Sequence, residues 1–351
     1  MLDKTKEKIL KKKGFKIQTF ETYNNLAIKF LNEFSIELRK NKKFLNYPNL
    51  IYLMYWCNSK TKLIKKKTDN LISLGRGLAF HVCPSNVPTN FVYSFIFGIL
   101  SGNSNIVKIP SKDFDEKKII LEVIEKLFRK KIFKPLKTSN QFIEYTPDDD
   151  ITKYLSSICD VRLIWGGNKT INDVRKHWIP ERSIDLTFAD RYSMCVINID
   201  TLKKSSNFNI NSVINKFFYD GYTMNQMACN SPHFVFWIGK EDKNFQNKFW
   251  KRLSKIVEKK FFFDEVHVVE KYSNLMENII YNGNFKNIDR FKNNLFVVSP
   301  DKNLKNIENI RGINGTFFQK NIKDLFDLKK FITKKCQTIS YYGVTRDQVK
   351  K

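Results

Sequence analysis

The residues best suited to chemistry lie between Asn225 and Phe236, where Cys229 follows an amphipathic segment and precedes an apolar run at Phe234 to Ile238. Pro232 cannot extend a helix, so it marks the break between the two. A thiol at such a junction can face a substrate while packed elements fix its backbone, and its thiolate is a good nucleophile. The alternative is a structural cysteine, because free cysteines are among the most buried residues and no histidine stands at a diagnostic distance.

Two other side chains could take part in the chemistry of such a thiol. Asn86 stands in the segment Pro-Ser-Asn-Val-Pro at 84–88, between a predicted strand and a predicted helix. An amide held there can donate a hydrogen bond to a developing oxyanion, which is worth about 3 kcal/mol for one such donor. An ordinary turn rich in turn-forming residues is the competing interpretation. His233 follows Cys229 by four residues in a predicted strand, so we expect it to point away from the thiol and to have a structural role.

Residues suited to a phosphate or a ribose stand at two other strand ends. Lys108 lies near the carboxyl end of an apolar strand and is followed by Ser111; a solvated lysine is the simpler alternative. Gly166 and Gly167 follow the strand at 161–165 and would let the backbone approach a dinucleotide. This pair is not a GxGxxG fingerprint, and alone it is a weak signal.

The elements that would position these residues alternate between strand and helix from Asp69 onward. Such alternation argues for an α/β fold with a parallel, doubly wound sheet, whose ligands bind at the carboxyl ends of the strands. Beyond Lys259 we predict short strands and Asn-rich turns. The predicted strands are Leu71–Cys83, Ile106–Ile109, Phe142–Tyr145, Val161–Trp165 and Met194–Ile199. The predicted helices between them run from Thr89 or Asn90 to Leu100, from Asp113 to Lys130, from a cap at Asp148 to Asp150 through Ile158, and from Thr170 to Trp178.

Composition limits the class of protein. A chain of 351 residues with 42% hydrophobic residues and 31 Phe has room for two folded domains. No apolar run is long enough to span a bilayer, the first residues lack a signal-peptide core, and the six scattered cysteines fit a reduced cytoplasm without a disulfide framework or a zinc site. The net charge of +27 comes from lysine spread over the whole chain, without an RNA-binding pattern. It favours attraction of anionic ligands over a dedicated nucleic-acid function.

The order of these motifs resembles the aldehyde dehydrogenase superfamily. It runs from Pro-x-Asn-x-Pro through Gly102-Asn103 and Lys108-x-Pro-Ser to a Gly pair and then Gln226-x-x-Cys229. The closer resemblance is to the acyl-CoA reductase family, the Lux-type long-chain fatty acyl-CoA reductases of bacterial bioluminescence. The segment Cys336 to Ser340 is similar to that family's Gln-Thr-Val-Ser segment.

This resemblance implies reduction of a long-chain fatty acyl-CoA to the aldehyde with NADPH or NADH. It makes Cys229 the acyl-accepting nucleophile, with Asn86 and the backbone N–H of Cys229 as the oxyanion hole. It assigns Lys108 and Ser111 to the adenosine ribose or its 2′-phosphate, and the glycine pair Gly166 and Gly167 to the pyrophosphate. It also implies an oligomer and an acyl-protein synthetase as partner. The expected domains are a helical N-terminal segment (1–68), a dinucleotide-binding domain (69–199) and a catalytic domain (200–351).

Two departures from the family pattern bear on function. Oxidising members carry a Glu that activates water, and the matching region here, Leu186 to Ser193, has none. This absence fits a reductase and disfavours the oxidative alternative. The family also continues past the Gln-Thr segment, so we expect the chain to lack closing elements at its C-terminus. A catalytically impaired subunit that binds an acyl-transferring partner is therefore a further alternative.

Overall fold

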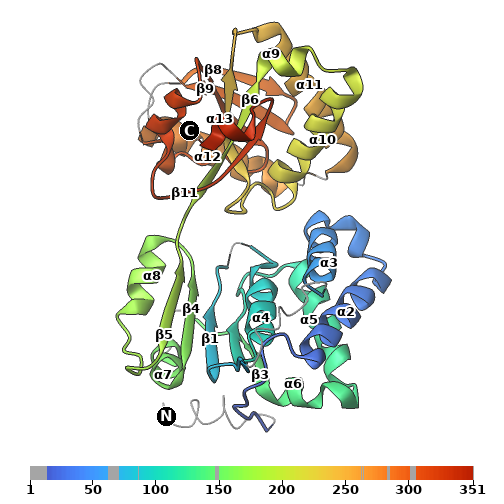
Figure 1. The fold of residues 1–351 in the computed structure, drawn as a ribbon, viewed down its shortest axis with the longest axis vertical. Coiled ribbons are helices and arrows are strands. Elements are labelled where there is room, and N and C mark those ends of the chain that lie inside the picture. The colour runs from blue at the N-terminus through green and yellow to red at the C-terminus, as the bar shows by residue number, and fades with distance from the viewer. Residues whose placement is uncertain are drawn as a thin grey trace. The chain divides into compact units, whose positions relative to one another are not determined.

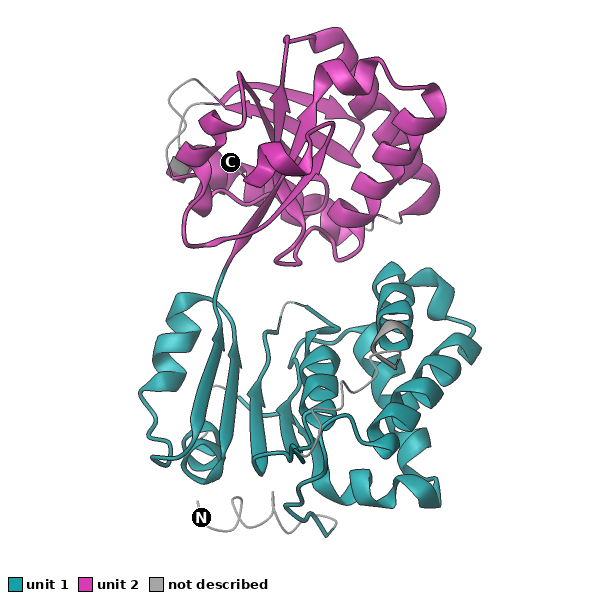
Figure 2. Ribbon diagram, in the orientation of Figure 1, with its two compact units in different colours: residues 1–190 teal, residues 191–351 magenta. Residues whose placement is uncertain are grey.

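The computed structural model describes residues 14–61, 71–85, 87–146, 150–261, 263, 265–282, 285–300 and 306–350. The chain divides into two compact units, residues 1–190 and 191–351 (Figure 2). Each unit is built around its own β-sheet with helices on both faces, as expected for an α/β fold.

The first unit contains a five-stranded sheet in the order β3-β2-β1-β4-β5, and every neighbouring pair is parallel (Figure 1). All five strands therefore present their carboxyl ends at one edge. The strands are β1 (Leu78–Val82), β2 (Ser104–Lys108), β3 (Asn140–Ile143), β4 (Val161–Trp165) and β5 (Ile184–Phe188).

Helices cover both faces of this sheet. One face packs on α4 and α5, with α2 and α3 beyond them, and the other packs on α7 and α8. In α2 the side chain of Asn24 caps the first turn by accepting the N–H of Ala27, and apolar residues at helical spacing bury one stripe. The helices are α2 (Asn25–Lys40), α3 (Pro48–Thr61), α4 (Asn90–Leu100), α5 (Asp115–Phe128), α6 (Lys134–Ser139), α7 (Ile151–Ile158) and α8 (Asn168–Arg175), with 3₁₀ turns at Phe44–Asn46 and Lys131–Phe133.

Two predictions for this unit need correction. The buried strand predicted over Leu71–Cys83 is only the five residues of β1, and Leu71 and Ile72 are 70% and 75% exposed. Backbone crowding at Gly75 explains the late start, since a Cβ there would lie 2.0 Å from the carbonyl oxygen of Gly102. Strand β5 was not predicted from the sequence. It is an edge strand with alternating exposure, so its apolar residues are not buried as in the central strands.

The second unit contains a six-stranded sheet in the order β11-β6-β7-β10-β9-β8, parallel except for the β8–β9 pair. The strands β7 and β9 are apolar over most of their length because helices cover both faces. The strands are β6 (Tyr192–Asn198), β7 (Pro232–Ile238), β8 (Phe285–Phe291), β9 (Leu295–Pro300), β10 (Thr316–Ile322) and β11 (Cys336–Tyr342).

The two faces of this sheet carry separate cores. Phe217, Phe249 and Trp250, from α10 and α11, pack on one face, and Leu275 of α12 packs on the other. The helices are α9 (Ile199–Lys203), α10 (Asn207–Tyr222), α11 (Lys243–Lys260), α12 (Glu265–Asn282) and α13 (Arg346–Lys350), with 3₁₀ segments at Ile307–Asn309 and Phe326–Phe331.

The structure differs from the sequence analysis at two places around this unit. The strand predicted at Met194–Ile199 is β6, which pairs with β7 and β11. The observed division therefore falls between Asp190 and Arg191, before this strand, whereas the predicted boundary stood after it. The second difference is α12, an 18-residue helix in the region where short strands were predicted. Its valines at 266, 268 and 269 favour strand by propensity, and tertiary packing overrides that preference.

Candidate active site around Cys229

Cys229 lies in the turn between α10 and β7, and its side chain is exposed. The structural-cysteine alternative is therefore wrong for this residue. Four of the other five cysteines are buried, and Cys336 is half-buried. Burial raises the pKa of Cys83, Cys159 and Cys195 to about 12, so these thiols stay protonated and unreactive at neutral pH. Exposure thus distinguishes Cys229 from the other five cysteines.

The Cys229 loop, which we define as residues 223–231, is fastened by the side chain of Gln226. This side chain is fully buried, and its Nε2 donates to the carbonyl oxygens of Pro232 (3.0 Å) and Thr316 (2.8 Å). Its Oε1 accepts the backbone N–H groups of Gly315 and Thr316, each at 3.1 Å. One amide therefore ties the loop to the starts of β7 and β10. This explains structurally why a Gln stands three residues before the cysteine.

The cysteine's own carbonyl group is also held. The hydroxyl of Ser193, a buried residue of β6, donates to the carbonyl oxygen of Cys229 at 2.6 Å. Two residues later the N–H of Ser231 donates to the carbonyl of Ala228 and closes the turn. Strands β6, β7 and β10 thus fix the backbone on both sides of an exposed thiol, which is the arrangement that precise attack on a bound carbonyl requires.

His233, the histidine nearest to Cys229 in the sequence, is not placed to act as its base. His233 lies buried on β7 with its Nδ1 3.0 Å from the carbonyl oxygen of Gly312. Burial, with a smaller effect of Arg311, lowers the pKa of His233 to about 3. The structural role predicted for His233 is therefore confirmed. His81 lies inside the first unit between Ser94 and Asn105, and burial lowers its pKa to about 4.

Asn86, the predicted oxyanion donor, lies outside the described residues. The residue before it, Ser85, and the residues after it from Val87 lie between β1 and α4, which is the predicted strand-to-helix connection. Thr89 occupies the N-cap position of α4 but makes no capping hydrogen bond through its side chain. The convergence of Asn86 on Cys229 remains a prediction.

The four residues predicted to bind a cofactor all stand at or just beyond the carboxyl edge of the five-stranded sheet. Lys108 is the last residue of β2, and its Nζ lies 4.4 Å from the centre of the Tyr145 ring. Ser111 is exposed three residues beyond that strand end. The pair Gly166 and Gly167 follows the last residue of β4. The parallel topology therefore brings these residues, which are far apart in sequence, to one edge of the sheet.

The two glycines differ in their surroundings. A Cβ at Gly166 would lie 3.1 Å from Cβ of Thr170, a tight contact where β4 turns into α8. Gly167 is the N-cap of α8, and a Cβ there would meet no atom within 4 Å. The start of this helix is thus open, and backbone N–H groups at a helix N-terminus favour anions. Together with Lys108 on the same edge, these features fit the phosphates of a dinucleotide.

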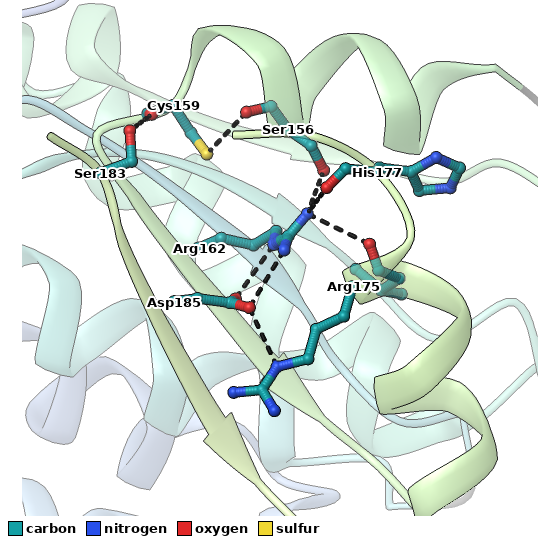
Figure 3. A network of polar contacts seen from close by, with 8 residues as sticks. Ser156, Cys159, Arg162, Arg175, His177, Ser183 and Asp185 are labelled. Atoms are coloured by element: carbon teal, nitrogen blue, oxygen red, sulfur yellow. Dashed lines mark hydrogen bonds and ion pairs between the residues drawn. The ribbon is translucent and has the colours of Figure 1, made fainter. Parts of the chain in front are cut away.

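A buried ionic network that was not predicted from the sequence joins β4, β5 and α8 near the amino ends of the two strands (Figure 3). Arg162 of β4 is 2% exposed, and its guanidinium makes two hydrogen bonds of 3.0 Å to Asp185 of β5. Its Nη1 also donates to the carbonyl oxygens of Val174 and His177 at the end of α8. The signal available in the sequence was a charged residue, Arg162, at the second position of the otherwise apolar run at 161–165.

Within the described part of the chain, no group of three or more His, Cys, Asp or Glu residues is placed to hold a metal ion. Among the described helices, none combines the length and apolar character needed to cross a membrane.

Comparison with solved structures defines the fold class. An oxidoreductase from Marinobacter aquaeolei superposes with a TM-score of 0.65 at 10% identity, over 96% of this chain and 77% of that one. An NAD-dependent aldehyde dehydrogenase from Sinorhizobium meliloti gives 0.61 at 11% identity, over 99% and 75%. Lactaldehyde dehydrogenase from Escherichia coli gives 0.59 at 9% identity, over 92% and 75%. The fold is that of the aldehyde dehydrogenases, as predicted.

The sequence comparisons define the family within that class. The model of the acyl-CoA reductase (LuxC) family matches residues 60–262, more than half of the 351 residues. The chain belongs to this family, and the predicted resemblance is confirmed. The match includes Lys108, Gly166, Gly167, Gln226 and Cys229.

Two curated relatives carry names that describe a reductase. The long-chain acyl-protein thioester reductase of Photorhabdus luminescens is 26% identical over 174 residues, 49% of this chain and 34% of that protein. Long-chain acyl-protein thioester reductase 2 of Photobacterium leiognathi is 27% identical over 184 residues, 52% of this chain and 36% of that protein. The alignments thus span about a third of the length of these relatives.

Proposed function

We propose that this chain reduces a long-chain acyl thioester to the aldehyde through an acyl group carried on Cys229. The observation that carries the proposal is an exposed thiol on a loop that Gln226 and Ser193 fasten to three strands. Membership in the acyl-CoA reductase (LuxC) family supports the same chemistry.

The acyl-transfer step follows from the thiol. The sulfur of Cys229 attacks the acyl carbonyl carbon, and the negative charge develops on the carbonyl oxygen. Asn86 and the N–H of Cys229 are the proposed donors to that oxyanion. Collapse of the tetrahedral species breaks the bond to the original thiol, which leaves with a proton. The product is a thioester between the acyl group and Cys229.

Reduction of that thioester requires a nicotinamide cofactor, which supplies the hydride when bound. The residues proposed to hold it are Lys108 and Ser111 for the ribose or its 2′-phosphate, and Gly166 with Gly167 for the pyrophosphate. The open start of α8 and the lysine on the same sheet edge support this assignment. A cation at the ribose favours NADPH over NADH. Calorimetry with both cofactors should show the difference, and Lys108→Ala should remove it.

The source of the acyl group has two chemical forms. The family is named for acyl-CoA, whereas the names of the two relatives describe an acyl group carried on a protein. Both are thioesters, and the attack by Cys229 is the same for each. We propose a fatty acyl-CoA as the substrate that can be tested directly, and an acyl-carrying partner protein as the second donor.

The test is the intact mass of the protein after incubation with a long-chain acyl-CoA. The proposal predicts a gain of one acyl group, which Cys229→Ala abolishes while Cys336→Ala leaves it intact. Acylation of the Cys229→Ala variant to the same extent would show that another residue accepts the acyl group.

A further inference from the structure

A polar cluster joins the Cys229 loop to the start of α12. We define it as Asn225, His267, Glu270 and Asn314. The Nδ2 of Asn225 and the Nε2 of His267 are 2.9 Å apart. The Nδ2 of Asn314 donates to the carbonyl oxygen of His267 at 3.2 Å and to Glu270 Oε2 at 3.3 Å. The backbone N–H of Asn314 donates to the carbonyl oxygen of Asn225 at 3.0 Å. Helix α12 thus holds the loop both directly and through Asn314.

The backbone is strained at Gln226, which adjoins the cluster: its φ of 64° lies in the left-handed region that residues other than glycine rarely adopt. Asn225 and Asn314, each with a φ of 52°, lie in the same region, which Asn tolerates better than other side chains do. Asn314 is fully buried, and its Oδ1 has no hydrogen-bond partner among the described residues. Both features reduce stability. Strain and unpaired polar groups of this kind concentrate at functional sites, where they fix a geometry that a relaxed chain would not hold.

The ring of His267 points toward Asn225 of the Cys229 loop, which suits a positioning role. Its Nε2 faces Asn225, four residues before Cys229, and its backbone carbonyl faces Asn314. Gln226 secures the adjacent part of the loop to β7 and β10, so the contacts of α12 supply a second, independent anchor. Loss of this anchor would leave the thiol present but free to move away from the attacking position. Small displacements of that size have large effects on rate.

We propose that α12, acting through His267 and Asn225, positions the Cys229 loop for acyl transfer. His267 is a positioning residue that acts through the loop and not on the substrate. The proposal rests on the proposed function for its catalytic consequence, whereas its structural part concerns the loop alone.

The first experiment compares His267→Ala with His267→Gln, whose amide can still reach Asn225. The rate constant for acylation of Cys229 by a long-chain acyl-CoA, measured by quenched mass spectrometry, should fall about tenfold in His267→Ala, the size expected for one hydrogen bond. The acyl-CoA concentration at half-maximal rate should stay within twofold, and His267→Gln should regain most of the rate. His177→Ala, the same change on the first unit, is the control and should match wild type.

The second experiment is a double-mutant cycle with Asn225→Gly, which keeps the left-handed backbone and removes the side chain. Coupling predicts that the double variant is no slower than the slower single variant. Fully multiplicative effects, or an unchanged acylation rate in His267→Ala, would overturn the proposal.

A third measurement separates this proposal from the proposed function. Hydrogen exchange of the peptide covering residues 223–231 should accelerate in His267→Ala and not in His177→Ala, whether or not acyl transfer occurs. If wild type takes up no acyl group, the proposed function fails while the exchange result still tests the anchor. Unchanged exchange in an otherwise folded His267→Ala protein would remove the structural basis for the anchor.

Discussion

Replacing Gln226 with Met tests the fastening of the Cys229 loop, because Met nearly preserves the volume and removes every hydrogen bond of the amide. The backbone N–H of Gly315 then loses its partner, whereas the N–H of Thr316 keeps the carbonyl of Ile313. The carbonyl oxygens of Pro232 and Thr316 each lose a donor. A buried polar group left unpaired costs about 1–3 kcal/mol. We therefore expect Gln226→Met to destabilise the second unit by about 3–4 kcal/mol.

Gln246 provides a matched control in the same unit. It is 4% exposed on α11, and its Nε2 makes one side-chain hydrogen bond, 2.7 Å long, to Asn321 Oδ1. Gln246→Met is the same substitution but removes a single hydrogen bond, so we expect it to lower the free energy of unfolding by about 1 kcal/mol. The assay is urea unfolding of both variants, followed by the fluorescence of Trp237 and Trp250, which are buried in this unit.

The two variants must differ in stability if Gln226 fastens the loop. Equal losses of stability for Gln226→Met and Gln246→Met, within about 0.5 kcal/mol, would mean that the four hydrogen bonds of Gln226 do not fasten the loop. A further readout is alkylation of Cys229 by iodoacetamide, located by peptide mapping. Its rate should change in Gln226→Met and stay at the wild-type value in Gln246→Met.

Three further predictions concern buried ionisable groups. Burial lowers the pKa of Lys271 from 10.5 to about 7, so the unfolded chain binds more protons than the folded chain between these pH values. The free energy of unfolding should therefore rise from pH 7 toward pH 10, by an amount of order 4 kcal/mol. Lys271→Met should flatten this rise, as measured by the urea midpoint at each pH. Asp185→Ala leaves Arg162 buried without its carboxylate and should lower the free energy of unfolding of the first unit by about 3–5 kcal/mol. The first unit should then unfold at a lower temperature. An unchanged thermal transition would contradict the stabilising role of the network. Burial lowers the pKa of His81 to about 4 and that of His233 to about 3, so below pH 6.5 the unfolded chain binds protons that the folded units do not. Both units should therefore lose stability as the pH falls below 6.5. Unfolding midpoints that do not change between pH 7 and pH 5 would contradict this.

The positions of the main elements around the site were predictable because local patterns determine them. The amphipathic α10, the break at Pro232 and the apolar β7 are each visible in residue type and spacing, so the place of Cys229 between helix and strand followed directly. The parallel alternation of strand and helix also predicted that Lys108 and the Gly166–Gly167 pair share one sheet edge, as the structure shows.

What the sequence could not show are the contacts that hold the loop. Gln226 bonds to groups on β10 some 90 residues away, and such pairing leaves no local pattern. Helix α12 was missed because its apolar residues do not all face the core: Val266 and Ile280 are 58% and 74% exposed. The exposure of Cys229 was likewise invisible, since it depends on how the loop leaves the sheet.

The boundary between the two units shows a similar limit. The apolar run at 192–198 reads equally well as the last strand of one sheet or the first strand of the next. Pairing with β7 and β11 places this strand in the second sheet, and β11 stands some 140 residues later in the chain.

The central claim is that Cys229 carries the acyl group, and the most direct measurement is the location and fate of that group. After incubation with a long-chain acyl-CoA, peptide mapping should place one hydroxylamine-sensitive acyl group on the peptide containing Cys229. Addition of NADPH or NADH should then release it as the long-chain aldehyde. An acyl group found on another residue, or an acyl-Cys229 that yields free acid and no aldehyde when the cofactor is added, would contradict the account.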